Sequence, residues 1–546
     1  MPPQRHPQAA VGPLERGLTV LRALAQAPDG RMRASELVKA TGLARSPVDR
    51  IATTLLRLGY LREDDGELVL APAVLALGNA YLRGSGVTRV LSPMARDLAD
   101  ELDESVSVAV PDGTAVRFVV QHTRRRALSV SFRVGDLLPA ERCAPGPLFA
   151  ADWTEARYAA WRQHAPTPFP AVPQGGAPHP SETELRRAAA QAAEHGWSVD
   201  DQLLEPGLIA VAVPIRDAAG RTSAALSVVS HTSRHTVDEL WASTRQRLQA
   251  TAERMSAALA APPAEPSPAL AALPAADQTS AAKGELGPEY LQSLARGLSA
   301  LAALGAEPDG MTLAAVAHAT GLARATVRRS LLTLAELGYA DSGEGGFRPL
   351  PQLLDLGYPV LSRLGLGEIA RPHLRELVQR VHESASVAVL DGPDIRYVSR
   401  VAANRIMSVS ITTGTRFPAH ATSMGRVLLA ALPASERQAW LASAPLPPLT
   451  PRTVTDPRHL GTELEQAAAE GFAMVDQELE EGLRSIAVPV HAGDGSVLAA
   501  VNISMHAGRT TADEARHNLL PALRAAAAAI SADIAVVTQA QELPSN

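Results

Sequence analysis

The sequence is a tandem duplication. The same short motifs occur twice in the same order along the 546 residues, and the members of each pair lie about 280 positions apart. This period is far longer than the repeats of solenoid proteins, so each copy is a complete multi-domain unit. The paired motifs are Arg16-Gly17-Leu18 and Arg296-Gly297-Leu298, Pro28-Asp29-Gly30 and Pro308-Asp309-Gly310, Glu104-Ser105 and Glu383-Ser384, Asp112-Gly113 and Asp391-Gly392, and Asp201-Gln202 and Asp476-Gln477.

A further repeated segment predicts a helix-turn-helix in each copy. Residues 40–45, Ala-Thr-Gly-Leu-Ala-Arg, return unchanged as residues 319–324. In both copies this turn joins two segments with apolar residues at helical spacing. Residues 61–70 then read as strand, turn and strand, which makes the first copy a winged helix. A helical hairpin in an ordinary core has a similar pattern, but the duplication, the hairpin and the local basic charge argue against it.

The side chains that point outward near the start of each second helix are candidates for contacts with base edges in a major groove. Asp49 stands where the second copy has Arg328, and an acid favours a cytosine amino group whereas arginine favours guanine, so we predict two different half-sites. Ser46 and Pro47 also fit a plain helix start, with serine as N-cap and proline at the first helical position. The predicted DNA-contacting residues are Arg45, Ser46, Asp49, Arg50, Arg324, Thr326, Arg328 and Arg329, with Lys39, Arg57 and Arg62 on backbone phosphates.

Charge and composition limit the kind of nucleic acid that the chain can bind. The net charge is −6, so a DNA-binding surface must be local, and residues 31–62 supply seven basic residues against two acidic ones. Aromatic residues make up 3% of the chain, which argues against the stacking platforms of single-strand binding and predicts an aliphatic core. Residues 311–340 have three arginines and one glutamate, a weaker bias. The alternative is therefore a metabolite-binding module or an enzyme that has lost DNA binding.

The sequence gives only weak signals for a catalytic site, a metal site or a membrane-spanning segment. The single cysteine, Cys143, excludes an internal disulfide and is expected to be a buried small hydrophobe. His231 and His235 have metal-ligand spacing but follow a strand, and Glu480 and Glu481 read as a solvated turn. We therefore expect no catalytic residue, no metal and no cofactor. The N-terminus shows no signal peptide, and residues 525–537 read as too short and too polar to span a bilayer, so we expect a cytoplasmic protein.

The order of predicted elements defines an α+β fold of two repeats. Each repeat is a winged helix-turn-helix domain joined by a helix, predicted over residues 72 to about 102 in the first copy, to a domain with a mostly antiparallel sheet. An Ala- and Pro-rich stretch separates the repeats and reads as a linker. The predicted boundaries are 1–13 for a disordered N-terminus, 14–72 and 289–350 for the winged helices, 73–256 and 351–540 for the sheet domains, and 257–288 for the linker.

This arrangement resembles the IclR family of bacterial transcriptional regulators over nearly the whole of both copies. The second copy has the more specific matches, at residues 405–410, 414–426 and 482–490, which are similar to the subgroup that controls aromatic-acid catabolism, the PcaR and PobR type. The resemblance implies a GAF-like effector domain that binds a small organic acid. It also implies a dimer or tetramer, so that this chain is expected to form a homo-oligomer or an internal pseudo-dimer on double-stranded operator DNA.

Carried over position by position, the resemblance implies a pocket in the second copy. Hydroxyl and amide groups would hold a carboxylate, apolar residues would shape a wall, and Arg405 and Arg484 could pair with the acid bidentately. In the first copy, Cys143 and Ala210 replace Thr422 and Ser485, so that domain is expected to be degenerate or to bind something less polar. The predicted pocket residues are Arg405, Ile406, Val409, Phe417, Ser423, Met424, Leu483, Arg484, Ser485, Asn502 and Ser504.

Overall fold

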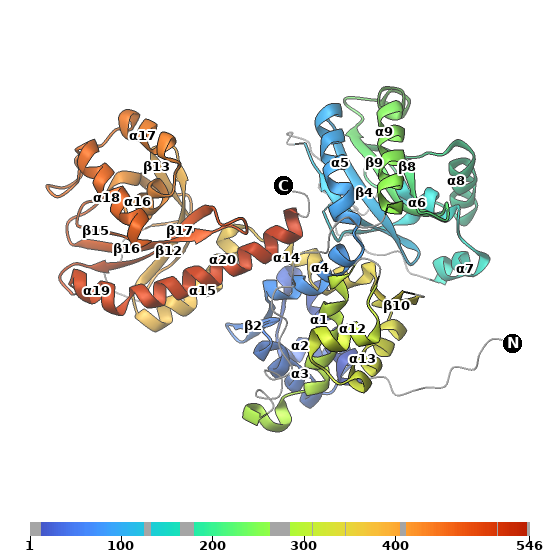
Figure 1. Cartoon of the computed structure of the whole chain (residues 1–546), viewed down its shortest axis with the longest axis horizontal. Coiled ribbons are helices and arrows are strands. Elements are labelled where there is room, and N and C mark those ends of the chain that lie inside the picture. The colour runs from blue at the N-terminus through green and yellow to red at the C-terminus, as the bar shows by residue number, and fades with distance from the viewer. Residues whose placement is uncertain are drawn as a thin grey trace. The chain divides into compact units, whose positions relative to one another are not determined.

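The computed structural model describes most of the chain in two compact units (Figure 1). The boundary between them falls between Arg363 and Leu364. The first unit therefore contains both winged helices and the first sheet domain, and the second unit contains the second sheet domain. The described residues are 12–124, 133–163, 179–261, 284–307, 310–343, 345–403, 411–509 and 511–542.

The first winged helix has three helices and a three-stranded sheet of order β1-β3-β2. Gly42 ends the second helix in the left-handed conformation, with φ of 67°, and so permits the sharp turn into the third. The buried residues of the third helix include Val48, Ile51 and Leu55, which confirms the predicted apolar face. The elements are α1 (Gly12–Gln26), η1 (Pro28–Gly30), β1 (Arg31–Met32), α2 (Ala34–Thr41), α3 (Arg45–Arg57), β2 (Leu61–Asp64) and β3 (Glu67–Leu70).

The second winged helix repeats this plan with a two-stranded wing. Gly321 corresponds to Gly42: it ends the second helix of this domain in the left-handed conformation, with φ of 65°. The elements are η4 (Gly287–Glu289), α11 (Gln292–Ala303), η5 (Leu304–Ala306), α12 (Leu313–Thr320), α13 (Arg324–Glu336), β10 (Ala340–Gly343), β11 (Gly346–Pro349), η6 (Pro351–Leu356) and α14 (Tyr358–Leu361).

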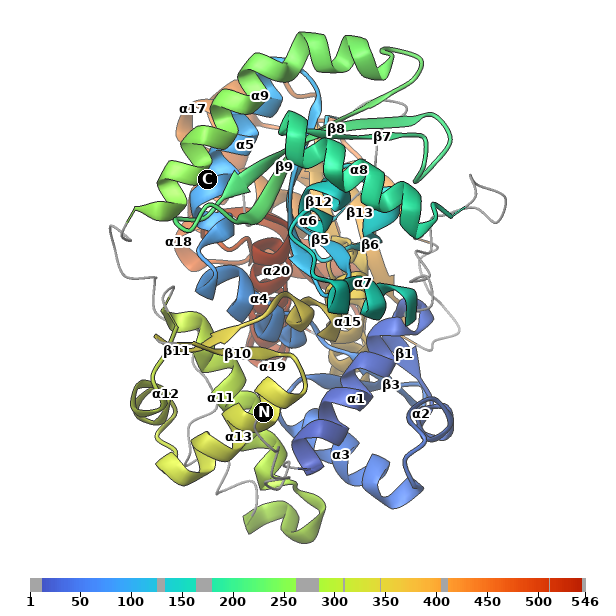
Figure 2. The same cartoon turned by 90° about the vertical axis from the view of Figure 1, so that its right-hand side faces the viewer.

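The two winged helices pack on each other through α1 and α11 (Figure 2). The contact is reciprocal. A Cβ on Gly17 would lie 2.3 Å from Leu294 Cδ1, and a Cβ on Gly297 would lie 2.6 Å from Leu14 Cδ2. Because Gly17 and Leu14 are the counterparts of Gly297 and Leu294, the same patch is used twice, as in a twofold dimer interface. The glycines are required here because the helices approach too closely for a larger residue.

The first sheet domain is a six-stranded antiparallel sheet of order β6-β5-β4-β9-β8-β7 with helices on both faces. Helices α5 and α9 cover one face, and α6 and α8 lie on the other (Figure 2). The elements are η2 (Pro72–Val74), α4 (Leu75–Gly84), α5 (Val87–Leu102), β4 (Ser105–Asp112), β5 (Ala115–His122), β6 (Leu137–Pro139), η3 (Ala140–Arg142), α6 (Pro145–Ala150), α7 (Glu155–Gln163), α8 (Glu182–His195), β7 (Ser198–Asp201), β8 (Leu208–Arg216), β9 (Thr222–His231) and α9 (Val237–Ala260).

The helical stretch expected over residues 72 to about 102 is confirmed, but it is not one continuous helix. It is divided into η2, α4 and α5, and the break lies at Gly86, whose φ of 65° cannot continue a right-handed helix. Residues 128–133, whose sequence indicates a strand, and the Pro-rich residues 166–180, whose sequence indicates a loop, fall largely outside the described residues.

A buried ion pair ties the connector of the second copy to the first sheet domain. Arg117 on β5 is 1% exposed, and its guanidinium lies 2.5 Å from Asp112 and 2.8 Å from Asp355 of η6. Two residues beyond η6, the Tyr358 hydroxyl donates a hydrogen bond to Asn79 of α4. The counterpart of Asp355 in the first copy is Ala76, so no reciprocal ion pair of this kind can form. This contact explains why residues 351–363 belong to the first compact unit.

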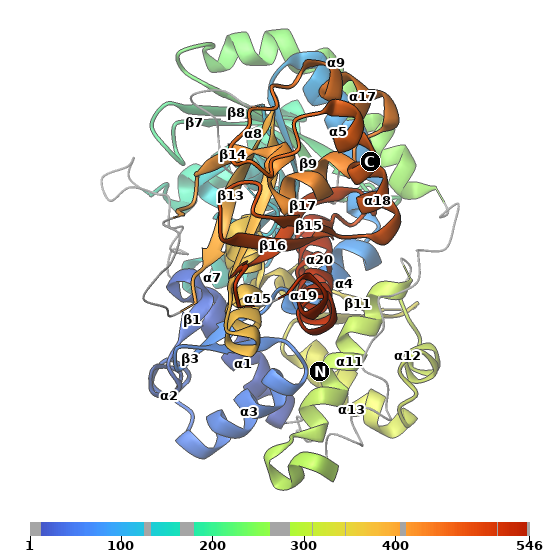
Figure 3. The ribbon, with the colours of Figure 1, turned by 90° about the vertical axis from the view of Figure 1, so that its left-hand side faces the viewer.

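The second unit repeats the sheet domain, with strand order β14-β13-β12-β17-β16-β15. Figure 3 shows α15 and α20 along one side of this sheet, and α16 packs on its other face against β16. The elements are α15 (Leu366–Val381), β12 (Ser384–Asp391), β13 (Asp394–Val401), β14 (Arg416–Pro418), η7 (Ala419–Ala421), α16 (Ser423–Ala430), α17 (Ala434–Ser443), α18 (Pro457–Glu470), β15 (Ala473–Asp476), β16 (Leu483–His491), β17 (Val497–His506), α19 (Ala512–Asn518) and α20 (Leu520–Glu542).

By length and composition alone, one described helix could cross a membrane. Residues 520–538 of α20 have a mean hydropathy of 1.6, and 44% of that stretch is buried within the protein. The core helix of a soluble domain has the same character, and α20 is bound to its own domain by a hydrogen bond from the backbone N–H of His491 to Ser531.

Candidate DNA-binding helices and effector site

The start of α3 presents polar side chains to solvent. The helix begins at Arg45 with Ala44 as its N-cap, so the expected N-cap role of Ser46 is wrong. Because Ser46 lies in the first turn and is exposed, its hydroxyl is available to an outside partner. Arg45 and Asp49, one helical turn apart, form an ion pair of 2.8 Å.

Two basic residues of α3 are engaged by the segment that leads into the second copy. Arg50 donates two hydrogen bonds to the carbonyl of Pro288, at 3.0 and 2.7 Å. Arg57 pairs with Glu285 at 2.7 Å. The backbone N–H of Leu291 donates to Thr54 Oγ1 at 2.9 Å. We call residues 285–291 the strap.

The strap modifies the sequence-based expectation for α3. Arg50 and Arg57 were expected to meet DNA, and both instead contact protein along one flank of the helix, while the side chains at its N-terminus stay outside that contact. The linker expected over residues 257–288 thus ends in a segment packed against α3, and α9 occupies its first residues as far as Ala260.

Helix α13 is the more open of the two. Arg324, Arg328 and Arg329 are all exposed, and within the described residues none has an ion pair or a side-chain hydrogen bond. Thr326 is half-buried at the same end of the helix. The three guanidinium groups therefore form a cationic patch at the N-terminal end of α13.

The remaining predicted phosphate contacts lie on α2 and the wing. Lys39 is exposed on α2, and Arg62 is half-buried on β2. The wing itself is acidic near its tip, where Asp64 and Glu67 bind Arg31 at 3.1 and 3.3 Å. The wing therefore offers less positive charge to DNA than the helices do.

In the second sheet domain, four of the predicted pocket residues come together. Ser423, at the start of α16, donates to Ser485 at 2.8 Å. Ser485 lies opposite Ser504 in the register of β16 and β17. Asn502 donates from Nδ2 to Ser504 at 3.0 Å, and its buried Oδ1 has no hydrogen-bond partner. These groups form a continuous polar cluster on the α16 side of the sheet.

The sequence-based prediction missed a cation beside this cluster. Arg400 on β13 lies opposite Ser386, which in turn lies opposite Asn502. Its guanidinium donates to Ser386 at 3.4 Å. Burial lowers the pKa of Arg400, because a half-buried positive charge loses hydration. The missing signal was the strand register, which aligns residues 14 and 102 positions away from Arg400 along the chain.

Arg484 does not join the cluster. It alternates with Ser485 along β16 and so points to the opposite face of the sheet. There it binds Asp476 at 3.0 Å. Burial raises the pKa of Asp476, but the hydrogen bond and charge of Arg484 outweigh that effect and lower it overall. Because its charge is already matched by Asp476, this structure does not support the expectation that Arg484 neutralises a ligand.

Only some of the apolar residues predicted for the pocket lie within the described residues. Met424 is fully buried in the core on the α16 side, and Phe417 packs edge-on against Tyr397, with ring centroids 5.9 Å apart. Leu483 is half-buried at the start of β16. The remaining predicted residues, Arg405, Ile406 and Val409, lie outside the described residues.

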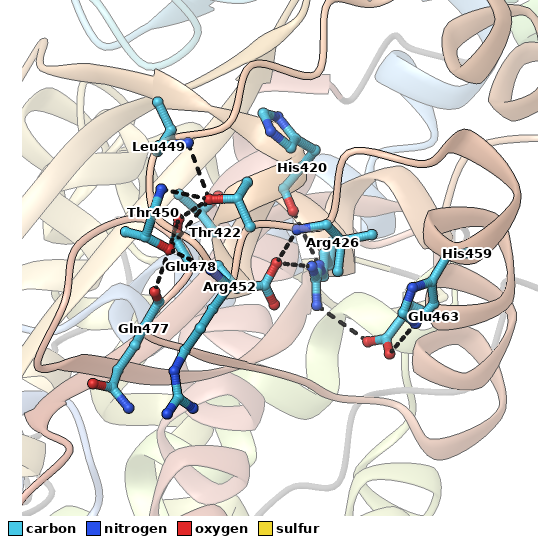
Figure 4. A network of polar contacts seen from close by, with 12 residues as sticks. His420, Thr422, Arg426, Leu449, Thr450, Arg452, His459, Glu463, Gln477 and Glu478 are labelled. Carbon is cyan, nitrogen blue, oxygen red and sulfur yellow. Dashed lines mark hydrogen bonds and ion pairs between the residues drawn. The ribbon is translucent and has the colours of Figure 1, made fainter.

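A buried charge network holds the loop between α17 and α18 against the domain (Figure 4). Arg426, 2% exposed, pairs with Glu478 at 2.6 Å and with Glu463 at 3.1 Å. Glu478 also accepts from the backbone N–H of Val454 at 3.0 Å, and Thr453 donates to its carbonyl at 2.6 Å. The first copy has Pro147 and Leu203 in place of Arg426 and Glu478, so it lacks this network.

The first sheet domain has a different interior. Cys143, the counterpart of Thr422, is buried as expected, and burial raises the pKa of its thiol well above the ordinary value. Ala210 stands where the second copy has Ser485. Among the described residues, no group of three or more His, Cys, Asp or Glu side chains is placed to hold a metal ion.

A groove of about 700 Å³ in the second unit is separate from the polar cluster. It is lined mainly by alanine and valine from α16, α18, β16 and α20, and none of the four clustered polar residues contributes to it. Its lining also includes Arg524, His491 and Ser531, but none of these is among the predicted pocket residues, so we do not assign the effector site to it.

Paired winged helices joined to sheet domains with a polar interior define a class: transcription regulators that couple a ligand site to DNA binding. The IclR helix-turn-helix domain matches residues 13–65 and 293–342, and the bacterial transcriptional regulator IclR C-terminal domain matches residues 79–257 and 358–532. The chain belongs to the IclR family of bacterial transcriptional regulators, as the motifs predicted, and carries both family domains twice.

Its relatives include regulators of aromatic-acid genes. The chain is 44% identical over 240 residues to the Pca regulon regulatory protein of Pseudomonas putida, a match that covers 44% of this chain and 82% of that protein. It is 32% identical over 241 residues to the p-hydroxybenzoate hydroxylase transcriptional activator of Acinetobacter baylyi, over 43% of this chain and 89% of that protein. A solved putative regulator from Rhodococcus sp. RHA1 shares 49% identity over 45% of this chain and 99% of its own, with a TM-score of 0.44.

Proposed function

We propose that this regulator senses an aromatic carboxylic acid with the second sheet domain and binds operator DNA with α3 and α13. The polar cluster beside Arg400 carries the proposal. It combines hydroxyl and amide donors with a half-buried guanidinium, the pairing that a buried carboxylate requires. The names of two relatives, which concern the Pca regulon and p-hydroxybenzoate hydroxylase, favour an aromatic acid.

Arg400 makes the ligand proposal testable. Calorimetric titration of the full chain with 4-hydroxybenzoate is expected to show binding that Arg400→Gln weakens at least tenfold, because a charge-assisted bond to a carboxylate is lost. The matched control is Arg484→Gln, which removes a guanidinium already paired with Asp476 and is expected to leave the affinity within about twofold. Equal losses in both variants would contradict the assignment.

On DNA, we propose that the N-terminal ends of α3 and α13 read base edges. Arg45, Ser46 and Asp49 act in the first helix, with Arg50 as a contact that the strap must release. Arg324, Thr326, Arg328 and Arg329 act in the second helix. Lys39, Arg57 and Arg62 add contacts to phosphates, and such contacts make affinity depend on salt.

The reciprocal packing of α1 and α11 supports an internal pseudo-dimer, in which one chain supplies both halves of an operator-binding pair. Since the two recognition helices differ at Asp49 and Arg328, the two half-sites should differ in sequence. Ligand binding would act by favouring one spacing of the paired helices over another. Sedimentation of the full chain tests whether further homo-oligomers form. A cytoplasmic location accompanies this proposal.

The rival proposal is a metabolite-binding module that has lost DNA binding. It is favoured by one observation, the engagement of Arg50 and Arg57 by the strap. A gel-shift assay of the full chain with its own promoter region separates the two. Retarded DNA that Arg328→Ala releases supports the regulator, and unretarded DNA at low salt supports the rival.

A further inference from the structure

The interior of the first sheet domain contains a row of polar side chains that lack partners. Ser107 on β4 lies opposite Gln121 on β5 and opposite Ser227 on β9. Ser107 and Ser227 are 0% and 1% exposed. Both hydroxyl oxygens and both terminal atoms of Gln121 are shielded from water without a hydrogen-bond partner. Directly opposite side chains have Cβ atoms only about 5 Å apart, so the three form one continuous polar surface.

This row faces the layer formed by η3 and α6. Ala109 and Ala225, the next opposite pair on the same face, pack in the core with Ala144 of that layer. The row continues through Ala212 to Ser198, whose hydroxyl donates to the carbonyl of Ala144. Ser198 is therefore satisfied by the protein, whereas the other members of the row are not.

Unpartnered polar groups in a protein interior are costly, and a run of them on neighbouring strands needs an explanation. The equivalent row of the second copy is more nearly satisfied within the protein. There Arg400 stands in place of Gln121 and donates to Ser386, the counterpart of Ser107. Asn502, in place of Ser227, donates to Ser504. At these positions the first copy therefore has no guanidinium, but its side chains can still donate and accept hydrogen bonds.

The chemistry of the row selects an uncharged ligand. Among the described residues, the row would offer a carboxylate a neutral amide and two hydroxyls but no cation, and it would offer an ammonium group no anion. Arg142 is a buried cation in η3, which belongs to the layer that the row faces. It donates a hydrogen bond to the carbonyl of Leu203, beside β7. Strand β7 is four strands away from Gln121 on β5. Gln121 offers one donor group and one acceptor, which matches the N–H and C=O of a primary amide in a paired arrangement.

We propose that the first sheet domain binds a small molecule carrying a primary carboxamide at Gln121, Ser107 and Ser227, as a second ligand site of different chemistry from that of the second copy. The domain is then a distinct sensor and not a degenerate one. This site depends neither on DNA binding nor on a carboxylate in the second copy.

Calorimetric titration of the full chain with benzamide and nicotinamide tests the proposal, with benzoate as the charged counterpart. We expect at least one amide to bind, and Gln121→Met to weaken it at least tenfold by removing both hydrogen-bonding atoms at nearly constant volume. The matched control is Arg400→Met, which should leave amide binding unchanged. Ser227→Ala is a smaller change that removes a single hydroxyl and should also weaken the amide.

Two results would overturn the proposal. One is the failure of both amides to bind at about 10 mM, which corresponds to an affinity too weak for a dedicated site. The other is amide binding that neither Gln121→Met nor Ser227→Ala weakens. If, in addition, Arg400→Met loses benzoate binding while amide binding is unchanged in both Gln121→Met and Ser227→Ala, this site is rejected and the proposed function still stands.

Discussion

At the scale of single residues, buried charge distinguishes the two sheet domains. In the second copy, Arg426 is matched by Glu478 and Glu463. In the first copy, Asp200 on β7 is 1% exposed and accepts hydrogen bonds from the backbone N–H groups of Leu203 and Leu204. Burial raises the pKa of Asp200 to about 7, against smaller opposing effects of those hydrogen bonds and of Arg142.

Asp200 should make the first sheet domain less stable as pH rises. Below about pH 4 the carboxyl is protonated in both folded and unfolded chains. Between about pH 4 and 7 it ionises in the unfolded chain but stays protonated in the folded one, so the free energy of unfolding falls by up to about 4 kcal/mol and then levels off. Asp200→Asn should remove this slope, because the amide keeps the acceptor oxygen and cannot ionise.

Urea denaturation followed by tryptophan fluorescence measures this effect, since Trp153, Trp161, Trp197 and Trp241 all lie in the first sheet domain, against one tryptophan, Trp440, in the second. The informative quantity is the difference between the wild-type and Asp200→Asn curves, in which other titrating groups cancel. Parallel curves between pH 4 and 7 would show that Asp200 ionises freely in the folded domain.

At the scale of elements, local sequence patterns predicted helices and strands, but they did not predict which distant segments are in contact. The apolar spacing of Val48, Ile51 and Leu55 predicted α3, and the strand–turn–strand pattern of residues 61–70 predicted the β2–β3 wing. Four of the predicted pocket residues proved to be neighbours. Arg400 was not predicted, and Arg484 lies on the opposite face from the cluster, because strand register decides which side chains share a face and no sequence signal specified it.

The strap illustrates the same limit at longer range. Arg50 and Pro288 are separated by 238 positions, and no helical or strand pattern links them. The strap also makes a prediction. Because Glu285 competes with DNA phosphate for Arg57, Glu285→Ala should raise the affinity of the full chain for promoter DNA by up to about fivefold at low salt, as expected for an exposed ion pair.

Fluorescence anisotropy with labelled promoter DNA checks the strap. Glu289→Ala is the matched control, because Glu289 is an exposed acid of the same segment with no side-chain partner among the described residues. Both variants change the net charge by the same amount, so the gain attributable to the released Arg57 is the difference between them. Equal gains would mean that the strap acts through general charge alone.

At the scale of the whole molecule, the duplication places two recognition helices in one chain, and the packing of α1 on α11 joins them. Gly17→Ala tests this contact. The added methyl group would lie 2.3 Å from Leu294 Cδ1 in a fully buried interface, so we expect the free energy of unfolding to fall by about 1–3 kcal/mol despite the better helix propensity of alanine.

Gly461→Ala is the control for Gly17→Ala, because Gly461 is also helical and the nearest atom to its added methyl group is 3.6 Å away. That variant should be neutral or gain up to about 1 kcal/mol. Differential scanning calorimetry of both full-length variants gives the comparison. Stabilisation of Gly17→Ala to the same extent as Gly461→Ala would mean that the α1–α11 contact does not persist in solution.

The central claim is that one chain reads two unlike half-sites with α3 and α13. Footprinting of the full chain on its own promoter region tests it most directly. Wild-type protein should protect two adjacent half-sites of different sequence, one helical turn or a multiple of it apart, and Arg328→Ala should weaken protection of one half-site more than the other. Two identical half-sites that Arg328→Ala weakens equally, or no protected site at low salt, would contradict the account.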